Sequence, residues 1–247
     1  APMLGGQSVL QLALPATHDT LTYDLSTTVS EGGWDGSAIL SWILHEFPQL
    51  TPGKFIRTEA HAQGLNITQQ LDAGVRYIDF RMMYDNATTA GGTPGWYSLH
   101  FVESNQFALE YMREIRAWLD SHPGEVVLLF TSKHGGVCNT GDKAYPGVSV
   151  AVRRAFWTQI KGVFEGLIFD SGKHLLNETT MAQMVASNER IVLAMGDYAE
   201  FTGNDTLAMD ACAMQDKAGS SMAEAGTIKD ASGPSYFAAA YNQSLEQ

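Results

Sequence analysis

The chain has 247 residues, 45% of them hydrophobic, which fits one large domain with a well-filled core. Lys and Arg number 15 against 27 Asp and Glu, so the formal net charge at pH 7 is -12. That charge argues against a nucleic-acid-binding protein and against purely electrostatic docking on anionic membranes, and no stretch approaches the roughly 20 apolar residues of a membrane span.

The first predicted element is a buried strand over residues 9–14, and it leads directly into a polar turn. An apolar run ends at Pro15, and His18 and Asp19 follow within four residues. In α/β folds, catalytic groups collect where parallel strands end. An isolated Thr-His-Asp is also compatible with a capped turn in which His18 has no chemical role. Residues further along the chain decide between these two interpretations.

Predicted strands alternate with predicted helices along most of the chain. Strands are expected over residues 75–82, 96–102, 125–131, 166–170 and 190–195. Helices are expected within residues 39–47 and over residues 68–73, 107–119, 151–163 and 181–187. The alternation is typical of a parallel α/β fold, and the length suits an eight-stranded TIM barrel. The signal fades after Phe201, so the last barrel units should be compressed, degenerate or missing within a single domain over residues 1–247.

Three predicted strand ends carry polar side chains that should converge. Asp79 and Arg81 are two residues apart on a strand, so they share one face. His18 with Asp19 and His100 belong to neighbouring strands. Buried charges are costly unless they are paired, so a purely structural role is hard to justify. Two histidines for proton transfer and one arginine for a phosphate are the groups that phosphoryl transfer uses.

Four segments in matching order resemble the phosphatidylinositol-specific phospholipase C X domain family. Residues 14–20 (LPATHDT) resemble its opening PGTHDS motif, and residues 70–81 (QLDAGVRYIDFR) resemble its segment Q-L-x-x-G-I-R-x-x-D-x-R. His100 stands where the second histidine of the family follows, and residues 122–128 (HPGEVVL) resemble its HPxEVV stretch. The similarity covers about residues 8–133.

The resemblance implies a distorted TIM barrel that cleaves phosphatidylinositol-type lipids by attack of the inositol 2-hydroxyl on phosphorus. In that mechanism His18 is the general base and His100 the general acid. Arg81 stabilises the phosphate, while Asp19 and Asp79 assist. The implied substrate is an inositol phospholipid or a glycan-anchored form at a membrane surface, and the sequence does not distinguish these headgroups.

Two positions place the chain nearer to one branch of that family. The calcium-dependent branch carries a carboxylate where this chain has Arg81 and an Asn where it has Asp19. Both departures resemble the metal-independent, bacterial-like branch, in which an arginine takes the electrostatic role of the metal, so we expect no metal and no cofactor. That branch also pairs its first histidine with an aspartate from a late strand, for which Asp210 and Asp230 are the weak candidates.

Further residues are candidates for substrate binding. Lys133 follows the fourth predicted strand as an inositol-binding lysine does in similar enzymes, although an exposed lysine fits equally. Asp197 and Tyr198 end the sixth predicted strand, where they either bind inositol hydroxyls or cap a turn. A catalytically reduced binding module on the same barrel is the alternative function. A glycerophosphodiesterase-like metal hydrolase is disfavoured by Arg81 in the pocket.

Other features predict a secreted protein that works at membranes. Five of the eight asparagines fit the N-glycosylation pattern: Asn66, Asn86, Asn177, Asn204 and Asn242. Cys138 and Cys212 are then candidates for one disulfide. Trp34 and Trp42 lie in the segment after the histidine turn and are candidate membrane-interface residues, although they would equally pack a helix against the barrel. The oligomeric state is not readable, and a monomer is the default.

Overall fold

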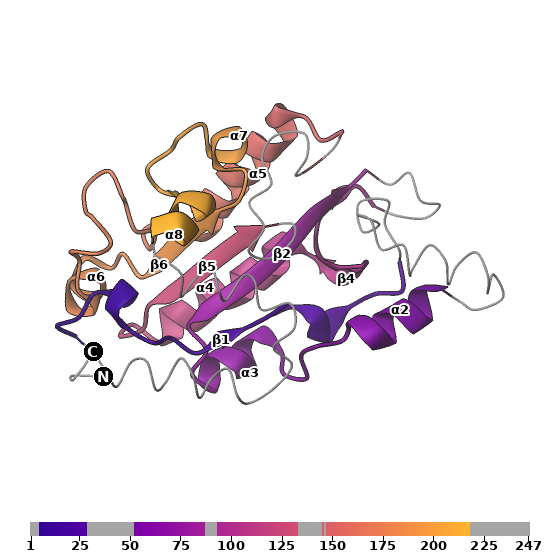
Figure 1. The fold of residues 1–247 in the computed structure, drawn as a ribbon, viewed down its shortest axis with the longest axis horizontal. Helices are drawn as coiled ribbons and strands as arrows, with labels where there is room; N and C mark the ends of the chain where they lie inside the picture. Colours follow the sequence, from indigo (N-terminus) through magenta and orange to yellow (C-terminus); the bar gives the residue numbers. More distant parts are fainter. Residues whose placement is uncertain (1–4, 29–51, 87–92, 133–144, 146, 218–247) are drawn as a thin grey trace.

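The computed structural model describes residues 5–28, 52–86, 93–132, 145 and 147–217. Within these residues seven strands form one mixed sheet in the order β4-β3-β2-β5-β6-β7, with β1 pairing alongside β2 (Figure 1). The strands are β1 (Ala16–Thr17), β2 (Tyr77–Asp85), β3 (Gly95–His100), β4 (Val102–Phe107), β5 (Val127–Ser132), β6 (Ile191–Met195) and β7 (Met209–Asp210). Strands β1, β2, β5, β6 and β7 are parallel, whereas β3 and β4 form an antiparallel hairpin. The open sheet is that of a distorted TIM barrel, as the sequence predicted.

Helices lie between the strands. They are α2 (Pro52–Ala60), α3 (Ile67–Asp72), α4 (Ala108–Ser121), α5 (Val150–Val163), α6 (Met181–Ser187), α7 (Tyr198–Thr202) and α8 (Ala211–Lys217), with short 3₁₀ helices η1 (Val9–Gln11) and η2 (Thr22–Asp24). Side chains fix several starts: Asn66 and Gln69 close a capping box on α3, and Thr180 and Gln183 do so on α6. Among the described residues, no helix combines the length and apolar character that crossing a bilayer requires.

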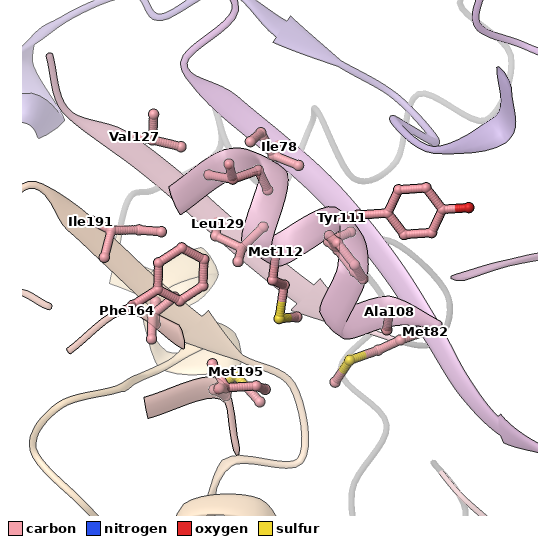
Figure 2. Packing of buried hydrophobic residues seen from close by; sticks show 14 of the residues in the cluster. Ile78, Met82, Ala108, Tyr111, Met112, Val127, Leu129, Phe164, Ile191 and Met195 are labelled. Carbon is pink, nitrogen blue, oxygen red and sulfur yellow. The ribbon is translucent and has the colours of Figure 1, made fainter. Parts of the chain in front are cut away.

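Residue alternation along β2 separates an apolar outer face from a polar inner face. Ile78, Phe80 and Met82 are fully buried and pack outward in the cluster that includes residues of α4 (Figure 2). The intervening residues Asp79 and Arg81 point to the opposite, inner face. Deeper on that inner face, Leu128 and Phe130 of β5 pack with Val192 and Ala194 of β6. The inner face is therefore apolar at its base and charged where β2 reaches Asp79.

Strand β2 also determines which histidines meet. Its first residues pair with β1 at Tyr77 and Ile78, and its last residues pair with β3 from Met82 to Asp85. Strand β5 pairs with β2 over residues 77–81 and so occupies the other edge. Strands β1 and β3 consequently follow one another along the same edge of β2. The turn after β1 and the end of β3 approach each other beside Asp79 and Arg81.

Two predicted strands differ from the structure. Residues 9–14 contain η1 in place of a strand, because Ser8 and Gln11 close a capping box around it, and only Ala16 and Thr17 pair as β1. Residues 166–170 form a turn with only a single bridge, Ile168 to Ile191, because Gly166 adopts φ +76° and the amide of Leu167 bonds back to Phe164. Strand β4 was not predicted. The helix expected within residues 39–47 lies outside the described residues.

Candidate active site

A tight turn after β1 places His18 and Asp19 beside the inner face of β2. Asp19 adopts the left-handed region with φ +50°, which aspartate tolerates better than most residues. The Asp19 amide donates to Oδ2 of Asp79 at 3.1 Å, and the Thr20 amide donates to the Asp79 carbonyl at 3.2 Å. On the outer side, Nε2 of Gln63 donates to the His18 carbonyl at 2.7 Å. Hydrogen bonds to the backbone of residues 18–20 therefore fix this turn from both sides.

Five side chains form one ionic cluster at this point. Arg81 NH1 lies 2.6 Å from Oδ1 of Asp19, and its Nε lies 3.3 Å from Oδ2 of Asp79. His18 reaches both carboxylates, with Nε2 at 3.2 Å from Asp19 and Nδ1 at 3.3 Å from Asp79. His100 Nε2 lies 3.4 Å from Oδ2 of Asp19. The structure thus brings together all five residues that the sequence proposed as catalytic.

The two histidines differ in exposure and in their partners. The side chain of His18 is 72% exposed, whereas that of His100 is 20% exposed. His100 Nδ1 lies 2.8 Å from the carbonyl oxygen of Ala60, at the last residue of α2. A carbonyl only accepts, so Nδ1 carries the proton and donates it, and Nε2 faces the cluster. Figure 1 shows α2 beside this end of the sheet. The His100 ring is therefore anchored at Nδ1, while His18 stands open to solvent.

The environments of the two carboxylates push their pKa values in opposite directions. Burial raises the pKa of Asp19, and the Arg81 guanidinium offsets this only in part. Asp79 is buried as well, but its hydrogen bond with His18 and the charge of Arg81 outweigh burial and lower its pKa. The hydrogen bond that His18 donates to Asp79 raises the pKa of His18 above its ordinary value of 6.5. An ionised Asp79 therefore makes His18 a stronger base and supports its imidazolium form.

Three of these residues also have the geometry of a cation site. Ligand atoms of His18, Asp19 and Asp79 all lie within 4.8 Å of one another. The Arg81 guanidinium lies against both carboxylates and already supplies positive charge there. A metal ion would have to share these oxygens with Arg81 at close range. The donor set therefore fits an arginine-neutralised site better than a metal-centred one.

Ser132 is a residue beside the cluster that the sequence reasoning missed. It is the Cα partner of Arg81 across the β2–β5 pair, so the two side chains share the inner face. Ser132 is only 4% exposed, and its Oγ has no hydrogen-bond partner among the described residues. Oδ1 of Asp79 is likewise buried and unpartnered there. The alternation Leu128, Phe130, Ser132 along β5 was the signal that could have identified Ser132.

The proposed substrate-binding residues at the end of β6 do not join the cluster. Asp197 is 3% exposed and accepts a hydrogen bond at 2.7 Å from Arg153, which is fully buried on α5. The hydroxyl of Tyr198 donates to the Asp205 carbonyl at 3.0 Å. Both contacts tie the β6–α7 turn to the outer layer of the fold. A role for Asp197 and Tyr198 in binding inositol hydroxyls stays a prediction.

The late-strand aspartate is also not found among the described residues. Asp210 ends β7, but its Oδ1 accepts the amides of Cys212 and Ala213 and thereby caps α8. Its neighbour Met209 packs in the inner cluster, so Asp210 points to the other face. The remaining expectations fall outside the described residues: Lys133, Trp34, Trp42, Cys138, Asn242 and Asp230. The disulfide with Cys212 therefore stays a prediction.

Comparison with known proteins identifies the family. The family model described as PI-PLC X 1 matches residues 54–210. The mouse PI-PLC X domain-containing protein 1 is 28% identical over 211 residues, covering 83% of this chain and 54% of the relative. The human protein of that name is 26% identical over 196 residues, covering 79% of this chain and 54% of the relative. The chain thus spans about half the length of these curated relatives.

Solved structures give weaker similarities. Phosphatidylinositol-specific phospholipase C of Staphylococcus aureus is 18% identical with a TM-score of 0.47, covering 83% of this chain and 56% of that chain. The enzyme of the same name from Listeria monocytogenes is 19% identical with a TM-score of 0.42, covering 78% of this chain and 54% of that chain. The family model alone covers more than half of the chain. The chain belongs to the PI-PLC X domain family.

Proposed function

We propose that this domain cleaves the phosphodiester of phosphatidylinositol-type lipids. The observation that carries the proposal is the convergence of His18, Asp19, Asp79, Arg81 and His100 on one end of the inner face. Two of these groups transfer protons near neutral pH, one binds a phosphate, and two are carboxylates that fix the others. Family membership supports the substrate class, because the family model that matches residues 54–210 is that of the PI-PLC X domain.

Four of these residues have distinct parts in the proposed reaction. His18 accepts the proton of the inositol 2-hydroxyl, whose oxygen attacks phosphorus. The bond from phosphorus to the glycerol oxygen breaks, and His100 donates a proton from Nε2 to that leaving oxygen. Arg81 stabilises the negative charge on the phosphate oxygens. Asp79 stabilises the imidazolium of His18, and the products are a cyclic inositol phosphate and a diacylglycerol.

One observation favours a second candidate, a lipid-binding module with reduced turnover. The candidate late-strand aspartate, Asp210, caps α8 and lies on the face opposite the inner cluster. A site without that partner retains phosphate recognition by Arg81. It would orient His18 through Asp79 and Asp19 alone. The two candidates share a ligand and differ in whether the phosphodiester bond breaks.

Phosphorus NMR of phosphatidylinositol vesicles incubated with the purified protein separates the two. We expect a cyclic phosphodiester signal from the parent, and at least about a hundredfold slower appearance with His18→Ala or His100→Ala. Vesicle cosedimentation should be preserved in both variants. The matched control is His122→Ala, since His122 stacks on Trp118 at the end of α4, away from the cluster. Binding without any product in the parent would establish the binding module instead.

We also propose that the protein is a secreted glycoprotein that acts at membrane surfaces. Four acceptor asparagines are exposed in support of this: Asn66, Asn86, Asn177 and Asn204. Expression in a secretory eukaryotic host should yield protein whose mass falls on treatment with an N-glycosidase.

Trp34 and Trp42 are the proposed membrane-interface residues. A Trp34→Ala variant should bind vesicles less while cleaving a water-soluble inositol substrate at the parent rate. Equal effects on both substrates would reject the interface role.

A further inference from the structure

The tip of the β3–β4 hairpin consists of a single residue, Phe101. His100 and Val102 are paired on either side of it, so one residue reverses the chain. Phe101 accordingly adopts the left-handed region with φ +64°. Glycine or asparagine enters that region at little cost, whereas a bulky aromatic residue is strained there. The residue is also 38% exposed. Neither backbone strain nor an exposed apolar ring benefits stability, so the choice of phenylalanine needs another reason.

The ring of Phe101 lies against the imidazole of His100. The two ring centroids are 4.8 Å apart, with the planes tilted by 36°. The imidazole is also bonded through Nδ1 to the Ala60 carbonyl, and its Nε2 faces Asp19 at 3.4 Å. One hydrogen bond leaves the ring free to tilt about that bond. The phenyl ring against the imidazole restricts this tilt.

We propose that Phe101 is a positioning residue that holds the His100 imidazole in the orientation its proton transfer requires. Transfer to a leaving oxygen demands a donor within about 3 Å and correctly aimed, so a small tilt of the ring slows the step. The catalytic consequence rests on the proposed phosphodiester cleavage. The orientation of the imidazole does not, and it can be measured in the absence of substrate.

The same hairpin supplies a matched control. Phe107, at the other end of β4, is 37% exposed, and its ring centroid lies 4.9 Å from that of Tyr97 with a tilt of 37°. Exposure and ring geometry are therefore nearly equal to those of Phe101. Phe107 has ordinary backbone dihedrals, with φ -65°, and none of the contacts described for it involves the ionic cluster.

The test compares Phe101→Leu, Phe101→Tyr, Phe101→Gly and Phe107→Leu. Phe101→Leu should lower kcat roughly tenfold, as a modest misplacement of a catalytic group does, with KM little changed. Phe101→Tyr retains the aromatic ring and should keep the parent kcat. Phe101→Gly should resist denaturant better than the parent while remaining slow, which a merely structural residue would not do. Phe107→Leu should keep the parent kcat.

NMR of the His100 imidazole protons gives a readout without turnover. Nuclear Overhauser contacts between the His100 imidazole and Ala60 should weaken in Phe101→Leu and stay in place in Phe107→Leu, whereas a shift of the signals alone would report only the lost ring current. Unchanged His100 contacts together with an unchanged kcat in Phe101→Leu would overturn the proposal. If the parent itself cleaves nothing, the proposed function fails. The His100 contacts in Phe101→Leu then still support or reject positioning on their own.

Discussion

Replacing Arg81 by lysine tests whether catalysis at this site requires the forked geometry of a guanidinium or only a positive charge. The guanidinium contacts Asp19 through NH1 at 2.6 Å and Asp79 through Nε at 3.3 Å, and its NH2 lies 3.2 Å from Nε2 of His18. A lysine has one nitrogen, so it can keep the contact to Asp19 but not the other two. Arg81→Lys therefore preserves the charge and removes the geometry.

The expected loss follows from those contacts. Removing one preorganised donor to developing negative charge costs about 10²–10³ in kcat, or about 2.7–4 kcal/mol. Stability should fall by less, about 2 kcal/mol, which is the size of one lost hydrogen bond to a charged group. The variant should therefore fold, and it should lose more transition-state stabilisation than folding stability.

The assay is the initial rate of phosphatidylinositol cleavage with EDTA and with added calcium, alongside a guanidinium unfolding curve. Neither addition should change the parent rate, because Arg81 supplies the positive charge. Arg76→Lys is the matched control: Arg76 lies directly before β2, pairs with Glu125 at 2.8 Å and lies over the Trp118 ring. Like Arg81, Arg76 forms an ion pair with a carboxylate, but none of the contacts described for it reaches the ionic cluster. Its kcat should stay at the parent value.

Two results would refute this reasoning. A parent-like kcat in Arg81→Lys would mean that charge alone suffices and that the forked contacts are incidental. Activity of the parent abolished by EDTA and restored by calcium would mean that a metal, held by the carboxylates and His18, carries the electrostatic role.

Three further predictions concern protonation, packing and the cysteines. The pKa of His18 is raised above 6.5 in the folded chain, so its contribution to stability is complete below pH 6.5 and is lost as the pH rises through the folded pKa. Between pH 6 and pH 8 the guanidinium unfolding midpoint should therefore fall less in His18→Asn than in the parent. Equal changes of the midpoint with pH in both proteins would contradict this. Arg153→Ala leaves Asp197 charged and buried, so its unfolding free energy should drop by about 3–5 kcal/mol, and a drop under about 1 kcal/mol in urea unfolding would show that the pair is dispensable. Cys138 and Cys212 should be joined, contributing about 4 kcal/mol in the chain-entropy model; titration of free thiols in the native, unreduced protein would exclude the bond.

Much of the candidate site was predictable because β2 carries it in a short, strongly patterned segment. The spacing of Asp79 and Arg81 required only strand alternation to place both side chains inside. His18 and His100 could be assigned to strand ends without knowing the exact strand bounds. These inferences depended on local sequence pattern, so they hold even when the predicted strand bounds are wrong by a few residues.

The errors arose where tertiary pairing overrode local pattern. Residues 9–14 are apolar enough for a strand, yet the cap at Ser8 closes a 3₁₀ turn, and only two residues pair with β2. The partner of Asp197 was not foreseen either, since a buried arginine on α5 donates to its carboxylate; a substrate-binding role for Asp197 and Tyr198 stays a prediction. No sequence pattern indicated that Arg153 would be buried. Ion pairs between residues far apart in the sequence cannot be predicted from local pattern, because they depend on how the helices pack on the sheet.

The left-handed turn at Asp19 has a consequence for how the site could change its chemistry. Aspartate and asparagine both enter that region at low cost, so the backbone after β1 accepts either one without rebuilding. The bonds that hold the turn, from the Asp19 and Thr20 amides to Asp79, leave the side chain at position 19 free to vary. Exchanging the cation at this site between an arginine and a metal would then require new side chains at positions 19 and 81, while the path of the chain stays as it is.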